Sequence, residues 1–98
     1  MEEQELRELV GRRIRAERKA CGYERLEDFA NRIGMDPSNL SRIEHGADLR
    51  VSTLVEVSRA LQLEPVLIPK EHVTAVRALL ESIYDAETEG SAQQPRFA

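Results

Sequence analysis

The stretch "GMDPSNLSRIEHG", residues 34–46, has the features that bound a short helix at both of its ends. Asp36 can cap the helix N-terminus, Pro37 suits the first helical position because its missing N–H costs nothing there, and Gly46 ends the helix. At 100° per residue, Leu40 and Ile43 lie on one side of this helix. The opposite side collects polar side chains that can donate hydrogen bonds, namely Ser38, Ser41, Arg42 and His45.

A second short helix is expected just before this stretch, over residues 26–32, with Phe29 and Ala30 facing inward. Gly34 tolerates the positive φ that a tight turn between two helices needs, and Ala30 is small enough for the point where the helices cross. The spacing therefore predicts a helix-turn-helix over residues 26–45. Such a helix fits the major groove of double-stranded DNA, where Ser can donate or accept at base edges and Arg can bind guanine O6 and N7. Two packed helices without a ligand, and a merely solvated polar face, are the alternatives.

Two further helices flank this unit. Apolar residues at three- and four-residue steps predict one over residues 3–21, closed by Gly22, and another over residues 52–61, capped by Ser52. Glu44 lies about 40° from Leu40 on the helical wheel and so points partly into the domain, at 100° per residue. A buried carboxylate needs a partner, and Arg18 is the candidate for a structural ion pair.

The pattern changes after residue 63. "EPVLIPK" places three apolar residues between two prolines, which favours a short edge strand and excludes a helix interior. Residues 70–84 regain a helical period, and residues 86–98 lack one, so we expect a disordered tail there. Because the strand has no partner in its own chain, we expect a homodimer in which strand and helix pair with a second copy. The residues expected at this interface are Val66, Leu67, Ile68, Val73, Val76, Leu80 and Ile83.

Composition narrows the class of protein. The 98 residues are 41% hydrophobic and 33% charged, which fits one small globular domain. Neither a membrane-spanning run nor a signal-peptide pattern is present, so we expect a cytoplasmic protein without a membrane partner. Cys21 is the single cysteine, and His45 and His72 lack ligand spacing, so no metal site is expected. With no Gly-rich phosphate loop and no serine elbow, we expect neither an enzyme nor a cofactor.

The charge distribution is uneven. The net charge is −4, which argues against non-specific binding to nucleic acid. Residues 1–8 hold four acids and one base, residues 9–50 nine bases and seven acids, and residues 51–98 four bases and seven acids. A weakly basic front half between acidic ends is compatible with a local anion-binding face.

Three segments, "GRRIRAERKACG", "FANRIGMDPSNLSRIEHG" and "STLVEVSRAL", resemble the phage-repressor-type helix-turn-helix family, also called the xenobiotic-response-element family, over residues 9–63. The resemblance implies a mainly α fold with a five-helix domain, dimeric binding to a palindromic operator, and transcriptional repression. We expect a DNA-binding domain over residues 1–63 and a dimerisation element, strand plus helix, over residues 64–85. By similarity, Arg18 and Glu44 match the family's ion pair between helices. Ser38, Asn39, Ser41 and Arg42 match the family's recognition positions, and Arg50 matches its phosphate-contacting loop. The residues expected to bind DNA are Arg25, Pro37, Ser38, Asn39, Ser41, Arg42, His45 and Arg50.

The chain departs from the family at "GYERLEDF", which is one residue longer than usual and lacks the Ser or Thr followed by Gln that contacts phosphate. Arg25 could replace that contact with a longer reach. The continuation "STLVEVSRALQLEPVLIPKEHV" is similar to HipB-like antitoxins, whose short strand pairs across the dimer. Three functions stay open: an antitoxin that represses its own operon and has a toxin protein as partner, a stand-alone regulator, and a protein-interaction adaptor.

Overall fold

The computed structural model describes the backbone of residues 1–91 and the side chains of residues 1–83. It divides into two compact units, one of residues Met1–Pro65 and one that begins at Val66. Each unit is described by itself. No helix among the described residues is both long enough and apolar enough to cross a lipid bilayer.

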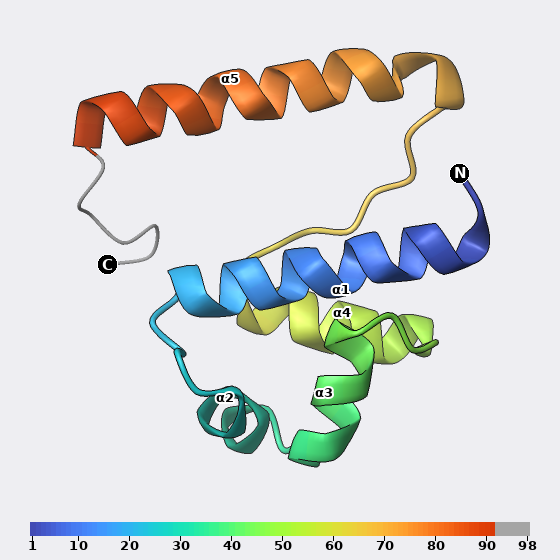
Figure 1. The fold of residues 1–98 in the computed structure, drawn as a ribbon, viewed down its shortest axis with the longest axis vertical. Helices are drawn as coiled ribbons and strands as arrows, with labels where there is room; N and C mark the ends of the chain where they lie inside the picture. The colour runs from blue at the N-terminus through green and yellow to red at the C-terminus, as the bar shows by residue number, and fades with distance from the viewer. Residues whose placement is uncertain (92–98) are drawn as a thin grey trace. The chain divides into compact units, whose positions relative to one another are not determined.

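The first unit contains four helices, α1 (Glu3–Ala20), α2 (Leu26–Arg32), α3 (Pro37–Glu44) and α4 (Val51–Ala60), shown from blue to yellow-green in Figure 1. α3 packs against both α1 and α2. The turn between α2 and α3 passes through Gly34 at φ 68°, which is a left-handed conformation that glycine adopts without strain. The turn is closed by the backbone N–H of Met35, which donates to the Ala30 carbonyl at 2.9 Å. This is the helix-turn-helix that the sequence predicts.

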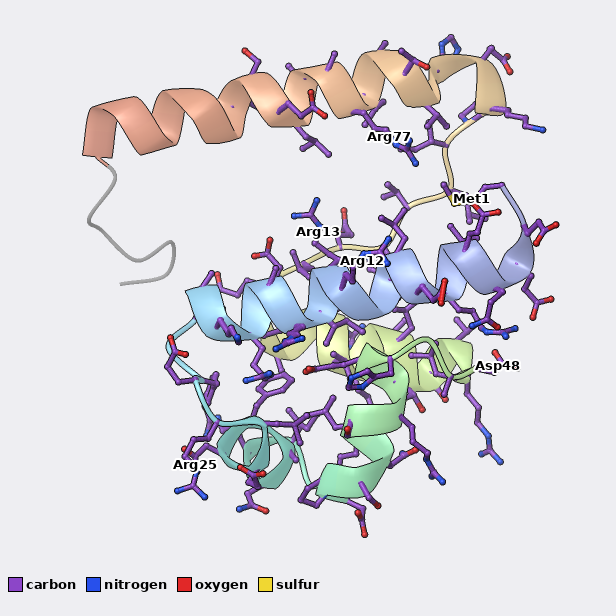
Figure 2. The ribbon with its side chains drawn as sticks, in the orientation of Figure 1. Met1, Arg12, Arg13, Arg25, Asp48 and Arg77 are labelled. Carbon is purple, nitrogen blue, oxygen red and sulfur yellow. The ribbon has the colours of Figure 1, made fainter. Side chains whose placement is uncertain are left out.

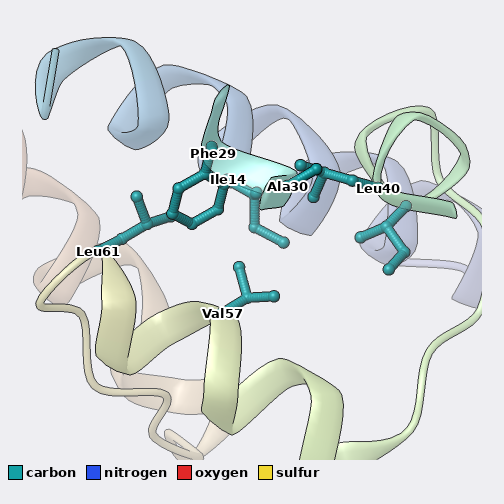
Figure 3. Packing of buried hydrophobic residues seen from close by; sticks show 7 residues of the cluster. Ile14, Phe29, Ala30, Leu40, Val57 and Leu61 are labelled. Atoms are coloured by element: carbon teal, nitrogen blue, oxygen red, sulfur yellow. The ribbon is translucent and has the colours of Figure 1, made fainter. Parts of the chain in front are cut away.

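All four helices of the first unit contribute to one hydrophobic core. Phe29 and Leu40 are completely buried. In Figure 3, Leu61, the C-cap residue of α4, points toward Phe29, and Val57 of α4 points toward Ile14. The ring of Phe29 also packs against Tyr23, with 5.2 Å between ring centroids. The buried apolar residues are Ile14, Phe29, Ala30, Leu40, Ile43, Val57 and Leu61. Because α3 supplies Leu40 and Ile43, burial of apolar surface fixes which side of α3 faces the solvent.

The second unit consists of an extended segment, a short 3₁₀ helix (Lys70–His72) and α5 (Val73–Ser91). α5 continues beyond residue 84, where the apolar period ends. Ala86, Glu87 and Glu89 are residue types that favour a helix, so the helix does not need an apolar stripe to continue. The expectation of five helices and a mainly helical fold is confirmed in the described residues. The remainder of the expected disordered tail, residues 92–98, lies outside the described residues.

Two expectations about local structure are wrong. No β-strand occurs in residues 1–91, so the strand expected at Val66–Ile68 is not formed. These residues are exposed and extended between Pro65 and Pro69, and an isolated segment has no neighbouring strand with which to exchange hydrogen bonds. In addition, α4 begins at Val51 and its N-cap residue is Arg50, without a side-chain cap, so Ser52 lies inside the first turn.

Candidate nucleic-acid interface

The N-terminus of α3 is fixed by Asp36. One carboxylate oxygen of Asp36, Oδ1, accepts hydrogen bonds from the backbone N–H of Ser38 at 2.8 Å and from the Ser38 hydroxyl at 2.6 Å. Pro37 follows at the first helical position, where no N–H is needed. The two hydrogen bonds from Ser38, the side-chain bond first, lower the pKa of Asp36 below its ordinary value of 3.8. The cap therefore carries a negative charge at neutral pH.

The solvent-facing side of α3 carries the polar residues that the sequence singles out. Ser38, Arg42 and His45 are exposed, while Asn39 and Ser41 are half-buried. Two hydrogen bonds order this face. An Arg42 guanidinium nitrogen, Nη2, donates to Asn39 Oδ1 at 3.3 Å, and His45 Nδ1 lies 2.7 Å from the Ser41 carbonyl oxygen. These contacts orient hydrogen-bonding groups on the exposed side of α3.

A buried ion pair holds the C-terminal end of α3 against α1. Arg18 Nε donates to Glu44 Oε2 at 2.8 Å and Arg18 Nη2 donates to Oε1 at 3.2 Å. The Arg18 and Glu44 side chains keep only 4% and 2% of their surface exposed. Arg18 Nη1 also donates to the carbonyls of Tyr23 and Glu24, at 2.7 and 3.0 Å. The structure thus brings together the two residues that the sequence pairs, and Arg18 additionally ties down the segment that leads into α2.

Two further contacts at this end of α3 have no counterpart in the sequence analysis. A Cβ added to Gly11 would lie 2.5 Å from the carbonyl oxygens of both Ile43 and Glu44, so the two helix backbones touch at this glycine. Arg7 Nε donates to the Gly46 carbonyl at 3.0 Å. The available signal was a glycine within an apolar helical pattern, which often marks close packing.

Exposed cations precede and follow α3 in the chain. Arg50 is exposed at the N-cap of α4, and Arg25 lies at the start of α2 with its side chain directed away from the other helices (Figure 2). Arg25 also lies 3.5 Å from the exposed carboxylate of Glu27, an ion pair that water weakens. The outer side of α1 bears further exposed cations at three- and four-residue steps, which the sequence analysis did not single out: Arg12, Arg15 and Lys19.

The residues assigned to dimerisation all belong to the second unit. Leu67 is fully exposed, and Val66 and Leu80 are 65% and 43% exposed. Ile68 and Ile83 are exposed as well, and Val73 and Val76 are half-buried. In a single chain these side chains therefore leave a substantial apolar surface in water. Among the described side chains, no three His, Cys, Asp or Glu residues form a group that could hold a metal ion.

Comparison with known proteins places this geometry in a family. Over 76 residues the chain is 38% identical to an uncharacterized HTH-type transcriptional regulator, y4dL, of Sinorhizobium fredii. That alignment covers 76% of this chain and 38% of the relative, so the chain spans well under half of the relative's length. No solved structure matches significantly. The family profile described as "Helix-turn-helix" matches residues 14–68, which include α2, the turn at Gly34 and α3. The chain belongs to the helix-turn-helix family.

Proposed function

We propose that this protein is a transcriptional regulator that binds double-stranded DNA with α3 in the major groove. The observation behind this proposal is the division of α3 into a buried side, which contains Leu40 and Ile43, and an ordered polar side. An α-helix fits the width of the major groove, and Arg42 can donate two hydrogen bonds to guanine O6 and N7. The Arg18–Glu44 pair supports the proposal because it keeps α3 in one orientation.

Phosphate contacts would come from cations beside α3. Arg50 lies in the connection that follows α3 and Arg25 at the start of α2, so both flank the reading helix in the chain. The net charge of −4 means that the protein as a whole repels DNA, so binding depends on these local cations. The affinity should therefore fall steeply with salt, with a slope of about −0.9 in log–log units for each phosphate contact.

The protein acts as a homodimer in this proposal. The support is the apolar surface that Leu67, Leu80 and their neighbours expose in a single chain, because burying it against a second copy would remove it from water. A two-fold axis then relates the two copies, and each α3 reads one half-site. Half-sites in such complexes lie about 34 Å apart, one turn of DNA, so the operator should be a palindrome. Bound at a promoter, the dimer would repress transcription.

The antitoxin role stays a prediction from the resemblance of residues 52–73. Co-expression with the product of the neighbouring reading frame, followed by co-purification, tests it. A stable complex would support the antitoxin function. Without such a complex, the protein would be a stand-alone regulator.

DNA binding is tested by selecting sequences from a random duplex library and titrating the selected duplex at several salt concentrations. Arg42→Ala should cost about 1–3 kcal/mol on the selected site and relax the preference at one base pair. Arg50→Ala should weaken binding to all sequences alike and reduce the salt slope by about 1. Arg77→Ala is the matched control, because it removes the same charge from α5. If Arg42→Ala and Arg50→Ala lost equal affinity for all sequences, Arg42 would not read a base. If the wild-type protein bound no DNA, the protein-interaction adaptor would be the remaining function.

Dimerisation is tested by sedimentation of the full-length chain. Leu80→Asp introduces a charge into the exposed apolar set and should shift the protein to a monomer, with weaker DNA binding. Thr74→Asp places the same charge on the same helix at an exposed polar residue and should leave the dimer intact. A wild-type monomer at micromolar concentration would refute the proposed dimer.

A further inference from the structure

The hydrogen bonds within the exposed face of α3 determine which groups are left to meet a ligand. A serine hydroxyl has one hydrogen to donate and two lone pairs that accept. The Ser38 hydroxyl donates its hydrogen to Asp36 Oδ1 at 2.6 Å. While this bond exists, Ser38 can only accept a hydrogen bond from a further partner.

The reverse arrangement, in which Asp36 donates to Ser38, requires a protonated carboxyl. The lowered pKa of Asp36 keeps this carboxyl ionised at neutral pH, and an ionised carboxylate only accepts. The backbone N–H of Ser38 holds the same oxygen at 2.8 Å, so the carboxylate cannot turn away without breaking the helix cap. The direction of the Ser38 hydrogen bond is therefore set by the first turn of α3.

Two neighbouring side chains are constrained in the same manner. Arg42 donates to Asn39 Oδ1, which leaves the two hydrogens of Asn39 Nδ2 for a ligand. The Ser41 carbonyl can only accept, so its 2.7 Å contact with His45 requires the proton on Nδ1 and leaves Nε2 of a neutral ring as an acceptor. The Asn39 bond is the longest of the three, at 3.3 Å, and the Ser38 bond is the shortest. The Ser38 hydroxyl is therefore the most firmly oriented group on this face.

We propose that Asp36 is a positioning residue that makes Ser38 an acceptor, so that Ser38 recognises an exocyclic amine in the major groove. The amines available there are adenine N6 and cytosine N4. Thymine O4 and guanine O6 and N7 are acceptors. A lone pair of Ser38 would face a lone pair of one of these atoms with no hydrogen between them, so no hydrogen bond would form. This inference rests on the proposed function, because it needs α3 in the groove.

The test removes single functional groups from the DNA. Selection with the full-length wild type and with Ser38→Ala first identifies the base pair whose preference depends on Ser38. At that pair, the adenine is replaced by unsubstituted purine, or the cytosine by 2-pyrimidinone, so that only the amine is lost. Wild-type affinity should fall about tenfold, whereas Ser38→Ala should bind both duplexes equally. A 7-deaza purine at the same pair removes an acceptor and should leave the affinity unchanged.

Variants of Asp36 test its positioning role separately from its role as a cap. Asp36→Asn keeps an oxygen that only accepts and should retain the discrimination between the normal and the amine-free duplex. Asp36→Ser is also a good N-cap residue, but its hydroxyl can donate to Ser38 and so free the Ser38 hydrogen. A freed Ser38 hydroxyl can donate as well as accept, so the discrimination should shrink while the duplex is still bound. A cap that acted only on helix stability would change both affinities in parallel.

The outcomes separate the inference from the function beneath it. If the wild type selects a sequence but is weakened by the 7-deaza base and not by the amine-free base, Ser38 is a donor and the inference is wrong, while DNA recognition stands. An unchanged selection by Ser38→Ala would show that Ser38 reads no base and would also overturn the inference. If the wild type binds no DNA, both the inference and the proposed function fail.

Discussion

The replacement Glu44→Ala should destabilise the folded domain strongly, although Glu44 faces no ligand in our proposal. The substitution leaves the guanidinium of Arg18 buried with 4% of its side chain exposed and without its counter-ion. Two of the four hydrogen bonds of Arg18 disappear, and those to the carbonyls of Tyr23 and Glu24 remain. Breaking a buried ion pair by removing one partner costs about 3–5 kcal/mol.

The two remaining carbonyl acceptors place the expected cost at the lower end of that range, about 3 kcal/mol. For a domain of 60–100 residues each kcal/mol shifts the melting temperature by about 4–8 °C, so the expected decrease is about 12–24 °C. Glu44→Gln keeps the shape of the side chain and an oxygen that accepts from Arg18, and its loss should be smaller. The order of stability should therefore be wild type, then Gln, then Ala.

Thermal and denaturant unfolding followed by circular dichroism measure these differences. Glu27→Ala is the matched control, because it also removes a glutamate from an ion pair with arginine, but at the surface, where both side chains are more than half exposed. Its cost should stay below about 1 kcal/mol. If Glu44→Ala melted with the control, within a few degrees of the wild type, the buried pair would not hold α3 and the reasoning about its rigidity would be refuted.

Three other perturbations separate physical effects in the same unit. Gly11→Ala should destabilise the domain by about 1–3 kcal/mol, because the added Cβ overpacks against the carbonyls of Ile43 and Glu44. Helix propensity alone predicts the opposite, a gain of about 1 kcal/mol. The sign of the measured change in unfolding free energy therefore shows which effect dominates. Asp36→Ala should lower the melting temperature at neutral pH. Because the pKa of Asp36 is lowered in the folded state, its stabilisation is present above the ordinary value of 3.8 and lost in acid, where the two proteins should melt alike. Gly46→Ala should be destabilising too, since φ is 98° and a Cβ would lie 2.8 Å from Glu8 Cγ.

The helix-turn-helix could be predicted because its determinants are local. Gly34 and Asp36 act within one turn of their own positions, and the apolar spacing of Leu40 and Ile43 sets the buried side of α3 without knowledge of the rest of the fold. The ion pair could be predicted from the helical wheel. The angle between Glu44 and Leu40 places Glu44 partly on the buried side of α3, and a buried carboxylate needs a cation as its partner. Spacing alone could point to Arg18 because the arginine lies on the inner side of α1.

The expected strand at Val66–Ile68 was wrong because a strand is not a local structure. Alternating or β-branched residues indicate that a segment can pair, but hydrogen bonds to a neighbouring strand decide whether it does. The start of α4 was wrong for a different reason. Ser52 has the chemistry of a cap, yet the N-cap residue is Arg50, two positions earlier, and helix boundaries are set less sharply by residue type than the helices themselves.

The close approach at Gly11 joins the stability of the domain to the orientation of α3. Sequence reasoning assigned to α1 an apolar side and the Arg18 partner of Glu44, whereas its contact with α3 also depends on the absence of a side chain at this glycine. Gly11, Arg18 and Arg7 all act on the last turn of α3 and the residues just after it, while Asp36 and the turn at Gly34 fix its beginning. With both ends held, α3 cannot rotate to offer other side chains to a groove. The direction of the Ser38 hydrogen bond, set by the cap at Asp36, then stays the same on the exposed side of α3, which the proposed recognition of a base requires.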